Sequence, residues 1–68
     1  MSRFKFIGTV YGIHSIEGIT YAKEGDLIEF DIKDIVDSDR DGELLKVMLD
    51  IGRDFFAPYW LYNIRQLT

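Results

Sequence analysis

Apolar and polar residues alternate along most of this chain, with the period of two that is typical of β-strands. The alternation is most regular in residues 27–35 and 44–51. Within another alternating segment, residues 4–11, Gly8 indicates a bulge or the close approach of another backbone. The inward-facing residues predicted for the two most regular strands are Ile28, Phe30, Ile32, Leu45, Val47, Leu49 and Ile51.

Short segments rich in turn-forming residues separate these strands. Residues 12–18 predict a loop that contains a short edge strand, and residues 23–26 predict a tight turn. Residues 37–42 have the polar composition of a hairpin tip, and residues 52–54 predict a second tight turn. The chain therefore has the short strands and close connections of an antiparallel β fold.

The only proline, Pro58, is expected to end a strand that starts at residue 55, because proline donates no hydrogen bond to a strand ladder. Residues 59–62 then predict one short helical turn before a last strand over residues 63–67. These elements predict an all-β fold, a five-stranded antiparallel barrel formed by residues 1–68 as a single domain. Closure of a barrel removes the free edges of its sheet.

The chain has 68 residues, which allows one small hydrophobic core. It contains no cysteine and one histidine, so neither a disulfide nor an ordinary structural zinc site can stabilise it. Hydrophobic residues make up 47% of the chain, yet no segment approaches the roughly 20 apolar residues that span a bilayer. We expect a soluble, cytoplasmic protein that does not associate with a membrane.

The net charge of −4 is concentrated in one segment. Residues 24–43 contain nine acidic and two basic residues, a local net charge of −7. This segment would repel a phosphate backbone, which disfavours nucleic-acid binding, and would attract a protein partner with a basic surface. Alternatively, the charges serve only to keep the protein soluble. The carboxylates predicted to contact a partner are Glu29, Asp31, Asp34, Asp37, Asp39, Asp41 and Glu43.

Residues 37–42 spell D-x-D-x-D-G, a spacing that can wrap a calcium ion. In an EF-hand the twelfth loop position is a bidentate glutamate, but here that position is Met48, and the flanking segments predict strands instead of helices. The alternative is an acidic hairpin tip solvated by water. The candidate calcium ligands are Asp37, Asp39 and Asp41, with Glu43 as a further one.

Aromatic residues form 15% of the chain and are dense near its C-terminal end. Phe55 and Phe56 are adjacent, so in a strand one of them points inward and the other outward. The aromatic residues that follow Pro58 cannot all face inward from one helical turn, and exposed tyrosine and tryptophan favour binding. The alternative is that most of them belong to the core. The aromatic contacts predicted for a partner are Phe56, Tyr59, Trp60 and Tyr62.

The sequence offers little for catalysis, and we expect no enzymatic activity. His14, Ser15 and Glu17 suggest a triad, but side chains so close in sequence rarely reach the geometry it requires. We interpret His14 as a solvated loop residue. The glycines match no phosphate-binding fingerprint, so no nucleotide cofactor is expected.

Residues 19–67 resemble the SH3-like small barrels in the order of their features, from the Lys-Glu-Gly-Asp turn through the acidic strand and polar loop to the last strand. They also resemble the small SH3-like proteins of bacteriophages and bacteria at four positions near the C-terminus, which are Gly52, Phe56, Pro58 and Leu61. The Ala-Leu-Tyr-Asp-Tyr opening and paired tryptophans of eukaryotic SH3 domains are missing, so polyproline recognition is not implied.

The resemblance and the charge together predict a small protein-binding module, a phage or bacterial accessory protein that engages or inhibits a host protein. A structural subunit that self-associates through exposed aromatic residues is an alternative from a different class. A calcium-dependent module is a third hypothesis.

Overall fold

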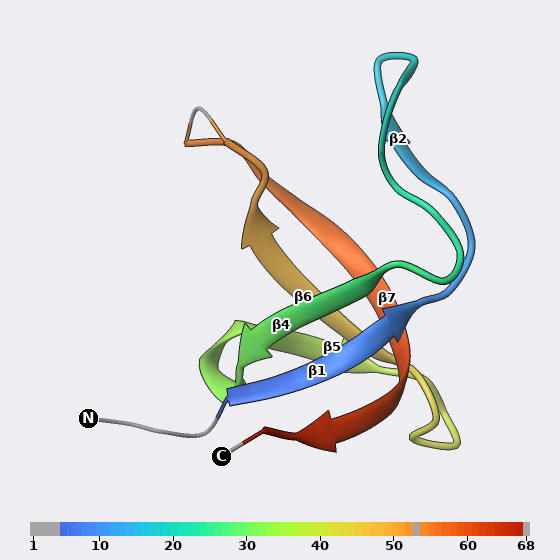
Figure 1. The fold of residues 1–68 in the computed structure, drawn as a ribbon, viewed down its shortest axis with the longest axis vertical. Coiled ribbons are helices and arrows are strands. Elements are labelled where there is room, and N and C mark those ends of the chain that lie inside the picture. The colour runs from blue at the N-terminus through green and yellow to red at the C-terminus, as the bar shows by residue number, and fades with distance from the viewer. Residues whose placement is uncertain (1–4, 53, 68) are drawn as a thin grey trace.

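In the computed structural model, which describes residues 5–52 and 54–67, the chain is all-β (Figure 1). A single three-residue 3-10 turn, η1, interrupts the strands of the described residues. The elements are β1 (Lys5–Val10), β2 (His14–Ile16), β3 (Ile19–Ala22), β4 (Leu27–Asp31), η1 (Ile32–Asp34), β5 (Ile35–Ser38), β6 (Leu45–Asp50) and β7 (Phe56–Gln66). The prediction of an all-β chain is confirmed.

Five strands form one antiparallel sheet in the order β4-β1-β7-β6-β5, and β2 and β3 form a separate hairpin. The long strand β7 pairs with β6 through its first half and with β1 through its second half. Leu61 is the residue where the halves meet, since it pairs with Leu45 on one side and Val10 on the other. Figure 1 shows that the sheet is strongly curled and that β7 bends along its length.

The edge strands β4 and β5 are consecutive in the chain and are connected through η1 alone. No pairing between them is found in the described residues, so the sheet does not close and the predicted barrel is not confirmed. The backbone N–H of Asp31 donates to Asp34 Oδ2 at 3.0 Å, which holds the turn. Because β4 ends at Asp31, the prediction that Ile32 points inward is wrong, and its side chain is 58% exposed.

The core lies inside the curl of the sheet and takes residues from β1, β3, β4, β6 and β7. Phe30 is 1% exposed and stacks on Phe6 with ring centroids 5.7 Å apart. The inward orientation predicted for Phe30 and Val47 is confirmed. Four other residues predicted to face inward, Ile28, Leu45, Leu49 and Ile51, are partly buried against this core.

Pro58 does not end a strand, and the helical turn predicted after it is absent from the described residues, because β7 continues through that segment. The Pro58 carbonyl accepts a hydrogen bond from the Tyr21 hydroxyl, on the side of β7 that faces away from β6. The N and C=O of a strand residue point to the same side, so the missing N–H also points away from β6. On that side the pairing of β7 with β1 begins only at Leu61, so the missing N–H of Pro58 removes no hydrogen bond from the sheet.

Gly8 lies where the register between β1 and β7 shifts, so the predicted bulge is confirmed. A Cβ at this position would lie 2.6 Å from Ile64 Cδ1 and 3.0 Å from Leu61 Cβ. The atoms that approach this position belong to side chains of β7, so the alternative prediction, a close approach by another backbone, is not confirmed. In the part of the chain that the structure describes, no helix is long and apolar enough to cross a membrane.

Candidate functional site

A hollow of about 290 Å³ lies between the end of β1, the turn before β4, the β5–β6 loop and the middle of β7. Acidic and tyrosine side chains dominate its lining, and we call it the acidic pocket. Its lining residues are Tyr11, Glu24, Asp39, Glu43, Leu44 and Tyr62. Four segments that are far apart in the sequence thus contribute carboxylates or phenol rings to one place.

The Glu24 carboxylate is fixed by two hydrogen bonds in this pocket. The backbone N–H of Gly12 donates to Oε1 at 2.6 Å, and the Tyr62 hydroxyl donates to Oε2 at 3.0 Å. The hydrogen bond to this carboxylate raises the pKa of the Tyr62 phenol. The Tyr62 ring also packs edge-on against Tyr11, with centroids 6.1 Å apart. The wall formed by these residues is therefore held in place before any ligand arrives.

Asp39 organises the opposite wall, which is the β5–β6 loop. Its Oδ1 accepts the backbone N–H of Glu43 at 2.8 Å and that of Leu44 at 3.1 Å. The backbone N–H of Asp39 in turn donates to the Leu44 carbonyl at 3.0 Å. Asp39 is half-buried, whereas Glu43 is exposed and lines the same hollow. The loop thus presents one structural carboxylate and one that is accessible to a ligand.

The D-x-D-x-D-G loop does not gather its carboxylates around one point. Asp37 Oδ1 accepts the N–H of Ser38 at 2.8 Å, and Asp39 holds the loop as described above. No three acidic or histidine side chains lie close enough together to hold a metal ion in residues 5–52 and 54–67. Calcium binding by Asp37, Asp39 and Asp41 stays a prediction, and it would require the loop to rearrange.

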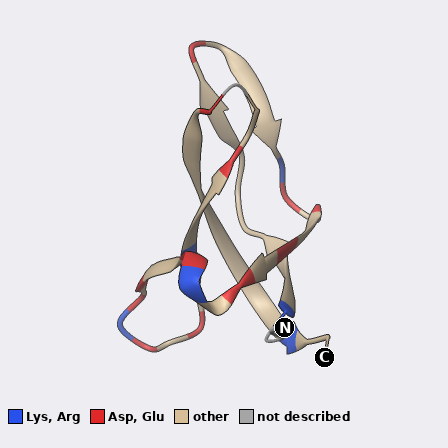
Figure 2. Cartoon of the chain, turned by 90° about the vertical axis from the view of Figure 1, so that its left-hand side faces the viewer, with Lys and Arg blue, Asp and Glu red and all other residues tan. Residues whose placement is uncertain are grey.

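The other predicted acidic contacts lie along the two edges of the sheet (Figure 2). Glu29 and Asp31 are on β4, Asp34 is in η1 and Asp37 is on β5. Lys5 Nζ lies 3.5 Å from Asp31, and Lys33 Nζ lies 3.8 Å from Asp34. These two lysines partly neutralise the acidic edge, whereas no ion pair is found among the described residues for the carboxylates of the acidic pocket.

The predicted aromatic surface is only partly present. Tyr59 is 7% exposed and belongs to the core, so its predicted place on a contact surface is wrong. Trp60 and Tyr62 are half-buried, and Lys46 Nζ lies 6.0 Å from the Trp60 ring centroid. Phe55 and Phe56 are both exposed, which contradicts the prediction that one of them points inward. Phe55 precedes β7 and belongs to the turn, so strand alternation does not apply to it.

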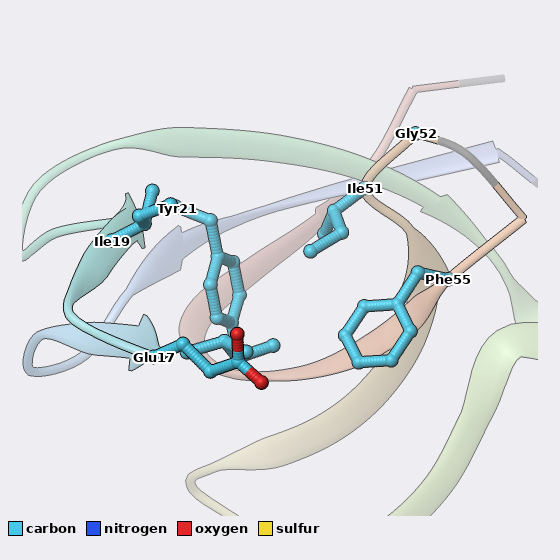
Figure 3. Close-up of a pocket in the computed structure, with 7 residues that line it drawn as sticks. Glu17, Ile19, Tyr21, Ile51, Gly52 and Phe55 are labelled. Atoms are coloured by element: carbon cyan, nitrogen blue, oxygen red, sulfur yellow. The ribbon is translucent and has the colours of Figure 1, made fainter.

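A second hollow, of about 580 Å³, separates the β2–β3 hairpin from the β6–β7 turn (Figure 3). We call it the apolar groove, since most of its lining side chains are apolar. The lining residues are Ile16, Glu17, Ile19, Tyr21, Ile51, Gly52 and Phe55. This groove was not predicted from the sequence, apart from the expectation that one of Phe55 and Phe56 points outward.

The β2–β3 hairpin is attached to the sheet at its base. The Tyr21 ring packs edge-on against Tyr59 with centroids 5.2 Å apart, and its hydroxyl donates to Pro58. His14 Nε2 lies 3.1 Å from the Tyr11 carbonyl oxygen and 3.4 Å from the backbone nitrogen of Trp60. His14 is therefore a half-buried residue of β2 and not the solvated loop residue that we predicted.

Raising the pH above 10 is expected to destabilise the fold through Tyr21 and Tyr59. Burial raises the pKa of both phenols, and for Tyr21 the neighbouring Tyr59 adds to the effect. The unfolded chain ionises near the ordinary pKa of about 10, so their contribution to stability is complete below that pH. It is lost as the pH rises through the raised pKa values of the folded state.

Urea unfolding at a series of pH values from 8 to 11.5 measures this loss. The control is the double variant Tyr21→Phe, Tyr59→Phe, in which the decline in stability above pH 10 should be smaller. An equally steep decline in the double variant would show that other groups cause it.

The two hollows therefore differ in chemistry, one being acidic with phenol rings and the other apolar with one carboxylate. Both are accessible in the described structure and both are formed by segments remote in sequence. Their geometry is the basis on which a function can be argued, because no known protein family, curated protein or solved structure matches this chain.

Proposed function

We propose that this protein is a small protein-binding module whose acidic pocket takes a lysine or arginine side chain of its partner. The observation that supports the proposal is the convergence of Glu24, Asp39 and Glu43 with the rings of Tyr11 and Tyr62 around one hollow. A cation is attracted both by carboxylates and by the faces of aromatic rings. Because Glu24 is already held by two hydrogen bonds, little ordering of that residue would accompany binding.

The surrounding charge supports the same partner chemistry. The segment 24–43 has a net charge of −7, and it includes the turn and the loop that line the pocket. Such a field accelerates the approach of a basic protein and weakens as salt is added. A partner that binds here would therefore show an association rate that falls with ionic strength.

The kind of protein is also part of this proposal. The strands β4 and β5 follow one another through η1, so they can be interpreted as one bent strand of an SH3-like small barrel. Together with the small size and acidic charge, this supports a cytoplasmic accessory protein of a phage or bacterium that engages or inhibits a host protein. Catalysis is not part of the proposed activity.

A titration with N-acetyl-arginine amide, followed by NMR, tests the pocket. We expect the resonances of Tyr11, Leu44 and Tyr62 to shift, and Glu43→Gln to weaken the affinity by about fivefold, the upper range for an exposed ion pair. Glu29→Gln is the matched control, because it removes the same charge from an exposed residue of β4 outside the pocket. If the two variants weaken the affinity equally, the effect comes from the net charge of the protein, and the proposal that the pocket binds the cation is overturned.

A further inference from the structure

The apolar groove leaves hydrophobic side chains in water on both of its walls. Ile19 is 71% exposed on the hairpin, and Phe55 is 50% exposed on the facing turn. Contact with water is unfavourable for such surface, in proportion to its area. A two-stranded hairpin also has little stability of its own. A ligand that fills the groove would bury both walls and fix the hairpin against the sheet.

The one acidic side chain in the lining, Glu17, comes from the tip of the hairpin. Glu17 and Gly18 form the two-residue turn between Ile16 and Ile19, with φ values of +52° and +80°. Turns of this kind favour asparagine, aspartate or glycine at the first position, so glutamate is an unusual choice there. In the view of Figure 3 its carboxylate lies between the Tyr21 and Phe55 rings.

The far wall adds negative charge of its own. Asp54 is exposed in the turn that carries Phe55, and Asp50 precedes it at the end of β6. Among the described residues of these two walls, every charged side chain is acidic; the one base that the sequence adds between Gly52 and Asp54, Arg53, lies outside the described residues. A second copy of the chain would bring an identical acidic rim against this one, which electrostatic repulsion opposes. The charge of the rim instead complements a basic ligand.

We infer that the apolar groove binds a segment of a protein partner in which an apolar side chain stands next to a lysine or arginine. The apolar side chain lies among Ile19, Ile51 and Phe55, and the cation meets the Glu17 carboxylate. A hollow of about 580 Å³ with a mostly apolar lining and one charged group is typical of ligand sites.

This site is distinct from the acidic pocket, with which it shares no lining residue. From Phe55 to Tyr62 the strand extends by about 23 Å at its usual rise per residue, so a single side chain cannot fill both hollows. The inference therefore goes beyond the proposed function, and either site can fail without the other.

Three capped dipeptides test the groove by NMR titration. We expect N-acetyl-Phe-Arg-amide to shift the methyl resonances of Ile19 and Ile51, with an affinity at least threefold higher than that of N-acetyl-Phe-Gln-amide. N-acetyl-Gly-Arg-amide should leave these resonances unchanged, and shifts of Tyr62 with that probe report on the acidic pocket instead. Equal affinities of the Phe-Arg and Phe-Gln peptides would overturn the inference.

Two matched variants locate the binding. Ile19→Ser should abolish the shifts produced by the Phe-Arg peptide, whereas Ile13→Ser, which changes a side chain that is 72% exposed outside the lining, should leave them intact. Glu17→Gln should reduce the affinity for the Phe-Arg peptide to that for the Phe-Gln peptide. If Ile19→Ser has no effect, or if it disperses a dimer seen by sedimentation of the unliganded protein, the groove has a different role and the inference fails.

Discussion

Replacing Phe30 with alanine is expected to lower the free energy of unfolding by about 3–5 kcal/mol at 25 °C. The Phe30 ring is 1% exposed and lies at the centre of the core, in contact with the Phe6 ring from β1. Truncating a buried phenylalanine to alanine costs about 3–5 kcal/mol, from lost burial and from the cavity that remains. A domain of this size has a total free energy of unfolding of roughly 3–10 kcal/mol. The single substitution therefore removes a large part, or all, of the stability.

Urea unfolding followed by circular dichroism measures the loss. Phe56→Ala is the matched control, since the same atoms are removed from a ring that is 57% exposed, and its effect should stay within about 0.5 kcal/mol. Similar losses in the two variants would mean that Phe30 does not have the central position in the core that the structure assigns to it.

The same residue shows why much of the strand pattern could be predicted from the sequence. In a strand, alternate residues face opposite sides, so the alternation around Phe30 and Val47 identified their buried faces without any tertiary information. Such predictions succeed when the determining interaction lies within the strand itself.

The errors occur where the determining interaction comes from a distant part of the chain. The sequence around Pro58 does not show that the Tyr21 hydroxyl meets its carbonyl, 37 residues away, on the side of β7 that β1 leaves unpaired. Ile32 continues the local alternation, but η1 redirects the chain between the two sheet edges. Local periodicity could reveal neither of these constraints.

The acidic pocket was likewise only half predictable. Asp39, Glu43 and Tyr62 were identified as candidate contacts from charge and aromatic density alone. Tyr11 and Glu24 were missed, although Glu24 belongs to the acidic segment. These two residues reach the pocket through the pairing of β1 with β7 and through a hydrogen bond between residues 38 positions apart. The distribution of charge along the sequence shows neither this strand pairing nor this hydrogen bond.

The second large effect on the free energy of unfolding is expected for Gly8→Ala, which tests how closely side chains of β7 approach β1. Among the glycines of the described chain, Gly8 is the one whose φ is not positive, so the added methyl group brings no backbone strain. Alanine also restricts the unfolded chain, which by itself would stabilise the protein by about 0.4–1 kcal/mol. Against this, overpacking of the kind expected beside Leu61 and Ile64 costs about 1–3 kcal/mol. We expect a net destabilisation of about 1–2 kcal/mol, measured by urea unfolding.

A double-mutant cycle with Ile64→Val identifies the atom responsible. Valine lacks the Cδ1 that would lie 2.6 Å from the new methyl group, so Ile64→Val should relieve part of the clash. The Leu61 Cβ at 3.0 Å is attached directly to the backbone and cannot move aside, so the rescue should be incomplete. The double variant should therefore be about 0.5–1 kcal/mol more stable than the sum of the single effects predicts. If the effects of Gly8→Ala and Ile64→Val on the free energy of unfolding were strictly additive, a clash with Ile64 would not be the cause of the loss in Gly8→Ala. Two side chains that compete for the same space cannot affect stability independently.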